Sequence, residues 1–194
     1  MTTSPGCVAL FAFVIREFRE LFSPQKTTMK KILATIQGQD IHHEITCDYE
    51  TVEFIGDMDI DCDGSGGNPY HDPYFQPDTS LHFPAKPNKL GKALHAETVP
   101  YVVVPPIVVK GTVGIVLGSL CEVSYQGHTV HAVVGDTGPT RKVGEGSPRL
   151  ADLLGIPSNP NTGGVDAFDV TYKVHVGVPA VIDGITYELQ RAGA

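Results

Sequence analysis

Hydrophobic and polar residues alternate along many short stretches of the chain, so that apolar side chains recur at every second position. A period of two is typical of strands that bury one face, whereas a helix repeats every 3.6 residues. The pattern predicts a hairpin in which residues 122–125 and 129–134 flank the turn Gln126-Gly127. Residues 101–104 and 107–109, rich in β-branched side chains, belong to the same β pattern. Further strands are expected over residues 31–37, 41–49, 51–62, 112–117, 170–176 and 185–189, the last after an Asp183-Gly184 turn.

The segment from Ser147 to Gly155 carries the signals of one short helix. Ser147 is a favoured cap residue, Pro148 suits the first helical position, and Gly155 suits the stop. The apolar face of this helix would be formed by Leu150, Leu153 and Leu154. Residues 64–80 are rich in Gly, Pro, Asn and Asp and predict a long loop. Many short strands with a single short helix predict a mainly β, single-domain fold closed into a barrel.

The first 28 residues differ from the rest. Residues 8–15 are apolar, but Arg16 and Arg19 follow this run instead of preceding it, as the basic residues of a signal peptide would. The run is also too short to span a bilayer. We therefore expect residues 1–28 to be an N-terminal extension, helical or poorly ordered, and residues 29–194 to form the barrel domain.

Composition and charge narrow the possible partners. The chain has 194 residues, 21 Gly and 15 Pro, which suits one domain with a real core and many turns. Its formal net charge of −8 argues against nucleic acid or an anionic membrane as a partner. The same charge suits a polycationic ligand, although it also serves simply to keep a small protein soluble. None of the four cysteines has the spacing of a metal site.

An acidic stretch, residues 56–64 with the sequence GDMDIDCDG, is the first candidate for chemistry. On a strand, Asp57, Asp59, Asp61 and Asp63 would share one face, and Met58, Ile60 and Cys62 the other. Four like charges on one face of a strand repel one another, and a fold that accepts this loss of stability usually gains a metal site, a cationic ligand or a raised pKa. The alternative is that the four aspartates form a solvated acidic edge. The stretch also matches the first half of an EF-hand loop, but Tyr70 stands where the twelfth-position glutamate belongs.

A second candidate is the turn at residues 135–139, with the sequence GDTGP, together with Glu145 nine residues after Asp136. Both acids lie in glycine-rich turns just after an apolar run, where a strand delivers its last residues to a rim. Two carboxylates on one rim are the minimum equipment for acid/base cleavage of a glycosidic bond. The alternative is that both are ordinary loop acids, one of them capping a turn.

Taken together, these motifs resemble the glycoside hydrolase family 75 chitosanases from about residue 54 to about residue 175. The resemblance is carried, in order, by DMDIDCDG at 57–64, QPDTSL at 76–81, VPYVVVP at 99–105, AVVGDTGP at 132–139 and GE at 144–145. It implies a double-psi β-barrel similar to that of the family 45 endoglucanases, and endolytic, inverting cleavage of chitosan. The chain departs from the family in reading GEGS where GEAS is frequent, and in lacking a clear secretion signal.

The resemblance places the catalytic pair on Asp136 and Glu145. We expect Glu145 to be the acid and Asp136 the base, with one of Asp59, Asp61 or Asp63 as the alternative base. The remaining aspartates of that strand would bind substrate amines, and Thr137 would orient the water or hold Asp136. From the long loop, Tyr70 and Gln76 are expected to contact substrate. No cofactor and no metal are expected.

Two other functions stay open at this stage. One is a phage or bacterial cell-wall lysin that cuts peptidoglycan glycan strands, and the other is a non-catalytic polysaccharide-binding barrel. The resemblance implies an extracellular, secreted enzyme whose partner is the polycationic polysaccharide, while the oligomeric state is left open. In an exported protein Cys62 and Cys121 would suit a disulfide, whereas in a reducing compartment both would be small buried residues.

Overall fold

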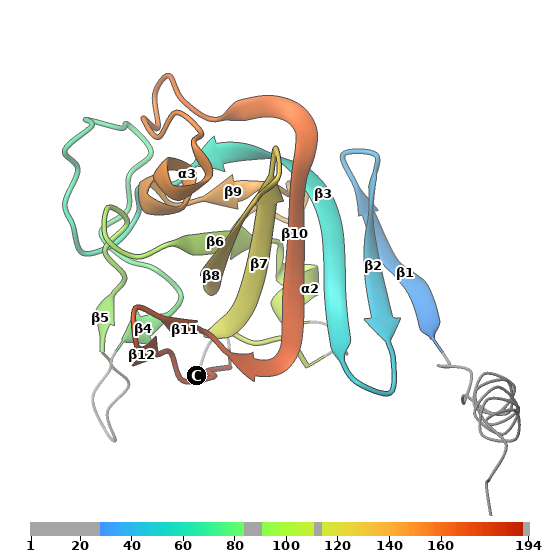
Figure 1. Ribbon diagram of the computed structural model, residues 1–194. Coiled ribbons are helices and arrows are strands. Elements are labelled where there is room, and N and C mark those ends of the chain that lie inside the picture. Colours follow the sequence, from blue (N-terminus) through green and yellow to red (C-terminus); the bar gives the residue numbers. More distant parts are fainter. Residues whose placement is uncertain (1–27, 84–90, 111–113, 192–194) are drawn as a thin grey trace, which may run out of the picture.

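Strands dominate the computed structural model, which describes residues 28–83, 91–110 and 114–191 (Figure 1). The longer strands are β1 (Met29–Ile36), β2 (Gln39–Ile45), β3 (Glu50–Ile60), β6 (Tyr101–Val104), β7 (Ser119–Tyr125), β8 (His128–Thr137) and β10 (Val165–Pro179). The two-residue strands are β4 (His82–Phe83), β5 (Lys92–Ala93), β9 (Glu145–Gly146), β11 (Val181–Ile182) and β12 (Ile185–Thr186). The helices within the described ranges are α2 (Pro106–Lys110) and α3 (Pro148–Leu154). The extension expected over residues 1–28 falls, apart from Thr28, outside the described residues.

Six strands close into a barrel in the order β3, β10, β7, β8, β6, β9 and back to β3. Two of the six pairings are parallel, β6 with β8 and β3 with β9, and the other four are antiparallel. The mainly β, closed-barrel fold class is thereby confirmed. β1 and β2 extend the sheet beyond β3 as a hairpin that lies outside the ring (Figure 1).

Residues with a left-handed backbone conformation, at positive φ, explain why the tight turns of the hairpins form where they do. Gln126-Gly127 has φ values of 46° and 83°, as a two-residue turn with positive φ at both centres requires. The same geometry recurs at Gln37-Gly38 between β1 and β2, and at Asp183-Gly184 between β11 and β12. The predicted hairpin over residues 122–134 and the predicted turn at Asp183-Gly184 are confirmed.

The helix predicted after Ser147 is also confirmed. The Ser147 hydroxyl accepts a hydrogen bond from the Leu150 amide, Pro148 lies in the first turn, and Gly155 ends the helix in the left-handed conformation at φ 75°. Leu150 and Leu154 are buried, but Leu153 is 41 % exposed. The expected apolar face is therefore made by two of its three leucines.

The strand predicted at 41–49 ends at Ile45, where the turn into β3 begins. Three other predicted extended segments are wrong in part. Residues 107–109 belong to helix α2, because Pro106 favours a helical start and both Val108 and Val109 become buried in the core. In the described part of residues 112–117, only an isolated bridge joins Leu117 to Gln190. The strand expected at 185–189 is confined to β12, because from Tyr187 onward the chain bonds to Ala180 and Leu117 instead. Tertiary packing overrides local β-propensity at each place.

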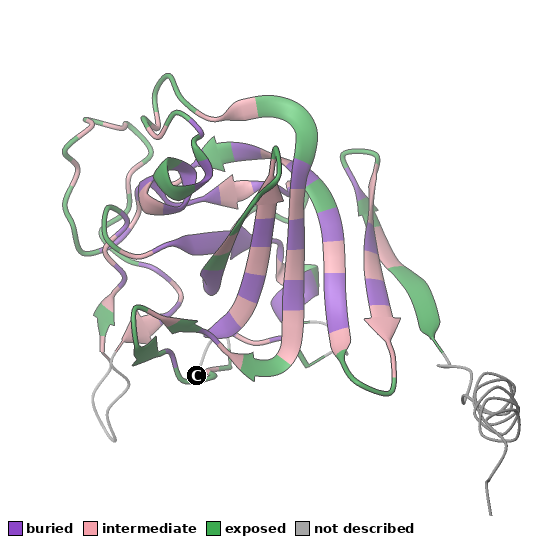
Figure 2. Ribbon diagram, viewed as in Figure 1, coloured by how far each residue is buried: buried purple, intermediate pink, exposed green. Residues whose placement is uncertain are grey.

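The alternation predicted for the acidic strand is confirmed by burial, and Figure 2 shows the same alternation along β3, β7 and β10. Met58, Ile60 and Cys62 are buried in the core, while the intervening aspartates are not. Beside them, the rings of Phe54 and Tyr172 stack at 5.0 Å. This packing fixes which face of β3 carries the acids.

The cysteines expected either to pair or to stay buried are free thiols. Cys62 and Cys121 are both buried, and neither is disulfide-bonded. Burial raises the pKa of the Cys62 thiol to about 12, and burial raises the pKa of Cys121 as well. Both thiols are thus uncharged and act as small apolar core groups.

Candidate active site

Four strands carry a row of neighbouring residues across the outer face of the barrel. On β3, Asp59 pairs with Glu145 of β9. Glu145 pairs in turn with Val103 of β6, and Val103 pairs with Asp136 of β8. Residues directly opposite each other in a ladder present their side chains on the same face. The two acids of the glycine-rich turns therefore face the same side of the sheet, with the β6 strand between them.

A groove of about 1050 Å³ lies over this row. Its acidic lining consists of Asp59, Asp61, Asp63, Asp72, Asp78, Asp136 and Glu145. Two lysines, Lys110 and Lys142, also line it. The volume suits several sugar rings, and the excess of carboxyl groups suits a ligand that carries positive charge.

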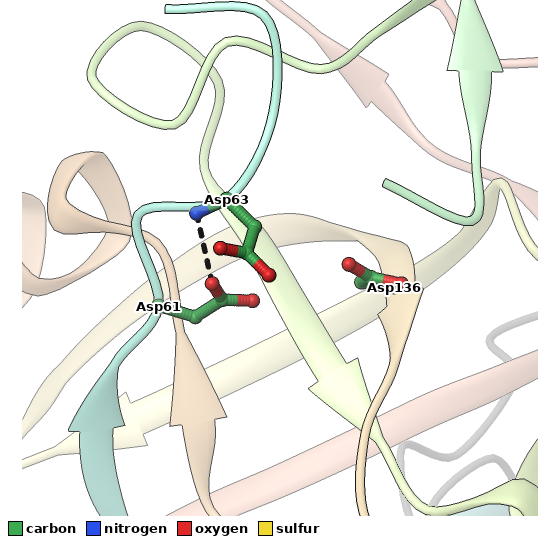
Figure 3. Close-up of side chains that lie close together, drawn as sticks. All are labelled: Asp61, Asp63 and Asp136. Atoms are coloured by element: carbon green, nitrogen blue, oxygen red, sulfur yellow. Dashed lines mark hydrogen bonds between the residues drawn. The ribbon is translucent and has the colours of Figure 1, made fainter. Parts of the chain in front are cut away.

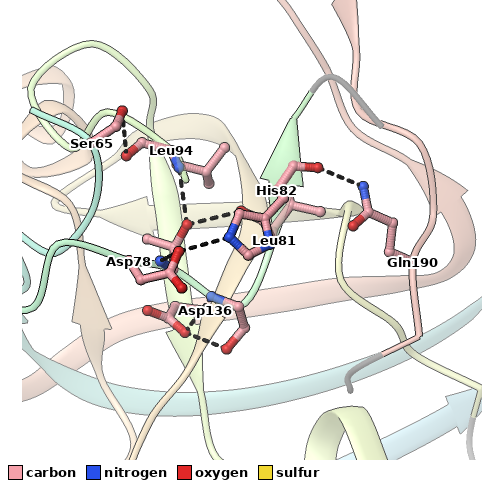
Figure 4. A network of polar contacts seen from close by, with 9 residues as sticks. Ser65, Asp78, Leu81, His82, Leu94, Asp136 and Gln190 are labelled. Carbon is pink, nitrogen blue, oxygen red and sulfur yellow. Dashed lines mark hydrogen bonds and ion pairs between the residues drawn. The ribbon is translucent and has the colours of Figure 1, made fainter. Parts of the chain in front are cut away.

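Asp136 is held by three donors on one oxygen. The amide and hydroxyl of Ser80 donate to Asp136 Oδ1 at 2.9 and 2.5 Å (Figure 4). The Thr137 amide donates to the same oxygen at 2.7 Å. Burial raises the pKa of Asp136, and the bonds from Ser80 and Thr137 oppose that rise. The net direction is a raised pKa. The hydrogen bonds to Oδ1 fix the side chain and limit that rise, because such bonds favour the charged form of a carboxylate.

Glu145 has a different surrounding. Its Oε1 lies 3.5 Å from Lys142 Nζ, and Lys142 also contacts Asp59. Burial raises the pKa of Glu145, Lys142 lowers it, and the carboxylates of Asp59 and Asp57 raise it again, for a net rise. A carboxyl group with a raised pKa retains its proton over more of the mildly acidic range, which suits a proton donor.

Asp61 and Asp63 approach Asp136 from the other side of the groove. Carboxylate oxygens of the three residues lie within 4.8 Å of one another, and their side chains converge (Figure 3). Burial raises the pKa of Asp61 to about 8, assisted by the charges of Asp63, Asp136 and Glu145. Asp61 is therefore protonated at neutral pH, which relieves the repulsion within the group.

Among the described residues, the carboxylates of Asp61, Asp63 and Asp136 are best placed to hold a cation. Calcium takes roughly six to eight oxygen ligands, so further oxygens would have to complete such a site. The EF-hand half-motif fails on geometry, because Asp59 pairs with Lys142 and does not join Asp61 and Asp63. The buried residue Tyr101 holds the segment from Asp61 to Asp63 in place, because its hydroxyl donates to the backbone carbonyls of Asp61 and Asp63.

The remaining residues expected at the site divide into two sets. The backbone N–H of Gln76 donates to Asp63 Oδ1 at 2.6 Å, and Gln76 lines the groove. Thr137 holds Asp136 through its amide, while its hydroxyl lies 2.9 Å from the Ser80 hydroxyl. Tyr70, by contrast, packs against the core and is absent from the groove lining. Tyr74 of the same loop lines the groove and is 85 % exposed.

Sequence reasoning missed Lys142, Ser80, Asp72 and Asp78 as lining residues. Asp78 accepts bonds from the Thr79 amide and from His82, in the network that also holds Ser80 near Asp136 (Figure 4). A signal was present for Ser80 and Asp78, since both lie in the segment QPDTSL that carries part of the resemblance. For Lys142 the signal was its position three residues before Glu145.

Replacing Gly138 with alanine should lower kcat about tenfold to a hundredfold with little change in thermal stability. A Cβ at Gly138 would lie 2.7 Å from Glu145 Oε2 and 2.9 Å from Val103 Cγ1. Val103 is packed, so the carboxyl group is what moves, and a displacement of about 1 Å can cost that much activity. Steady-state kinetics beside a melting curve test this, and an unchanged kcat would show that Glu145 tolerates the shift.

A closed β-barrel with two opposed carboxyl groups in an acidic groove has the equipment of a glycoside hydrolase. The family model described as fungal chitosanase of glycosyl hydrolase group 75 matches residues 58–190, which include every acid of the groove. The chain belongs to this family and is a chitosanase-type glycoside hydrolase. No curated protein matches the chain closely enough to serve as a relative.

Proposed function

We propose that the protein cleaves internal β-1,4 linkages of chitosan by single displacement, with Glu145 as general acid and Asp136 as general base. Family membership supports the hydrolase class and a polysaccharide substrate. The observation that carries the finer proposal is the separation of the two acids by one intervening strand.

That backbone separation leaves room for the wider carboxyl spacing that inversion needs. Neighbouring strands lie about 4.8 Å apart, so residues two strands apart in register have backbones about 9 to 10 Å apart. Inverting enzymes hold their carboxyl groups roughly 6.5–9.5 Å apart to admit a water, whereas retaining enzymes need about 5 Å. Acids on adjacent strands would suit a covalent intermediate, and Asp136 and Glu145 are not on adjacent strands.

The two environments support the assignment of roles. Three donors stabilise the charged form of Asp136, as a base that activates water requires. Burial raises the pKa of both residues, but Glu145 receives no hydrogen bond from a neutral donor among those found in the described residues. In the reaction the Glu145 proton passes to the glycosidic oxygen as the C–O bond breaks. Asp136 takes a proton from water as the water oxygen bonds to the anomeric carbon.

The acidic lining supports a polycationic substrate over peptidoglycan. Chitosan carries free amines that are protonated at mildly acidic pH, and carboxylates such as Asp63 and Asp72 would raise its concentration in the groove. Peptidoglycan is anionic at its peptides and fits this lining less well. A long polymer cannot enter a cell intact, so we propose that the enzyme acts outside it. No helix in the described residues is long and apolar enough to cross a membrane.

The proposal is tested by incubating the protein with highly deacetylated chitosan, chitin and peptidoglycan at mildly acidic pH and following reducing ends and viscosity. Reducing ends should be released from chitosan, and the viscosity of the chitosan solution should fall early because cleavage is internal. Added salt should weaken binding by screening the carboxylates. Release on peptidoglycan alone would favour a lysin, and binding without release on any polymer would favour a non-catalytic barrel.

A further inference from the structure

Lys142 occupies a position that the proposed acid/base chemistry leaves unexplained. It lies in the turn before β9, its ammonium contacts Asp59 Oδ2, and it lies 3.5 Å from Glu145 Oε1. Only 25 % of its side chain is exposed. Burial would lower the pKa of Lys142, but the contact with Asp59 and the field of Glu145 outweigh it and raise the pKa above its usual value. The ammonium is therefore charged throughout the working range.

The charge of Lys142 compensates an unfavourable pairing. Asp59 and Glu145 are direct neighbours in the parallel ladder of β3 and β9, where like charges repel. An ammonium between them allows both side chains to stay on the same face. The titratable groups that act on Glu145 or feel its charge come from three parts of the fold: Asp57, Asp59 and Asp61 from the β3 segment, Lys142 from the turn, and Tyr172 from β10. Lys142 is the one cation in that set.

We propose that Lys142 is a positioning residue for the proton transfer: anchored by Asp59, it orients Glu145 and stabilises the carboxylate that Glu145 becomes when it protonates the leaving oxygen. This inference rests on the proposed function, since it takes Glu145 as the acid. The negative charge that appears on Glu145 as its O–H bond breaks develops 3.5 Å from a fixed positive charge. A preorganised charge of this kind acts on the transition state without needing to move.

Two opposite effects on the kinetics follow. Without the ammonium, Glu145 becomes a weaker acid, because an opposite charge at this range shifts a carboxyl pKa by about one unit or more. The alkaline limb of the pH profile, where the acid loses its proton, should move upward by about one pH unit, and kcat should fall roughly tenfold. KM should fall as well, because the groove loses a charge that repels substrate amines. A purely structural role would not move the alkaline limb, whereas the fall in KM reports only the lost positive charge in the groove.

The test compares Lys142→Met with Lys142→Arg and with Lys110→Met, using the full chain and highly deacetylated chitosan. Lys110 lines the same groove but has no contact with Asp59 or Glu145 among those found in the described residues. Lys142→Met should show the raised alkaline limb with lower kcat and KM. Lys142→Arg should keep the alkaline limb at its wild-type pH, because the positive charge is retained, and Lys110→Met should also leave that limb at its wild-type pH.

The outcomes separate this inference from the proposed function. If the wild type releases no reducing ends from chitosan, the proposed function fails. If the wild type is active and Lys142→Met keeps the wild-type alkaline limb, the inference about Lys142 is overturned while the function stands. An upward shift of the acidic limb would also overturn it, because Glu145 would then work in its ionised form. Melting curves identify a variant that has lost its fold, and Lys142→Gln then replaces methionine.

Discussion

Changing Glu145 to glutamine should lower kcat on chitosan by about 10² to 10⁴-fold and leave KM within about threefold of the wild type. Glutamine keeps the shape of the side chain but cannot give a proton to the leaving oxygen, and positioned acid/base groups contribute about that factor. An interaction needed only in the transition state lowers kcat without weakening ground-state binding. Initial rates of reducing-end release over a range of chitosan concentrations measure both constants.

The matched comparisons are Asp136→Asn and Glu53→Gln. Asp136→Asn should cause a loss of similar size, since the water would lack its base. Glu53 lies on β3 outside the groove, so its amide variant makes the same chemical change away from the site and should keep wild-type rates. Substantial chitosan cleavage by a Glu145→Gln, Asp136→Asn double variant would exclude this pair as the catalytic carboxyls.

Changing Asp61 to asparagine should make the protein more stable than the wild type near pH 8 and flatten the pH dependence of its unfolding free energy. The pKa of Asp61 is raised to about 8 in the folded protein from a usual value of 3.8, chiefly by burial. The folded state thus binds a proton that the unfolded state has lost between these values. This contribution to stability is complete below about pH 4 and disappears as the pH rises toward 8. By linkage it amounts to a few kcal/mol, as an order of magnitude.

Urea unfolding of the wild type and of Asp61→Asn at pH 5 and at pH 8 measures this effect. The wild type should lose more stability between the two pH values than the variant does. The slope will not vanish, because burial also raises the pKa values of Asp136 and Glu145 in the same direction. Asp169→Asn, at an exposed position of β10, is the control and should behave as the wild type. Equal slopes for wild type and Asp61→Asn would contradict a protonated Asp61.

Features set by neighbouring residues could be predicted from the sequence. The turn with positive φ values can be predicted from two residues alone, Gln126 and Gly127. The helix cap at Ser147 and the stop at Gly155 can be predicted from a segment of nine residues. The alternation around Met58 and Ile60 likewise predicted which face of β3 would be buried. Each of these signals depends on propensity or periodicity within a few residues, and the fold satisfies them locally.

Features that depend on distant pairings could not be predicted in this way. Lys142 meets Asp59 only because β9 joins β3 in parallel, 83 residues apart in the sequence. Ser80 reaches Asp136 across 56 residues for a similar reason. Within one loop, composition did not distinguish Tyr70, which packs on the core, from Tyr74, which faces the groove. Burial and partner charge decide these roles, and both follow from the closed barrel.

The most direct measurement is proton NMR of the wild-type enzyme acting on highly deacetylated chitosan, recorded before the new reducing ends equilibrate. Asp136 and Glu145 lie two strands apart, which leaves room for a water between acid and base. The first product should therefore be the α-anomer, formed by inversion of a β-linkage. A β-anomer as the first product would contradict single displacement, and no product from chitosan would contradict the proposed activity itself.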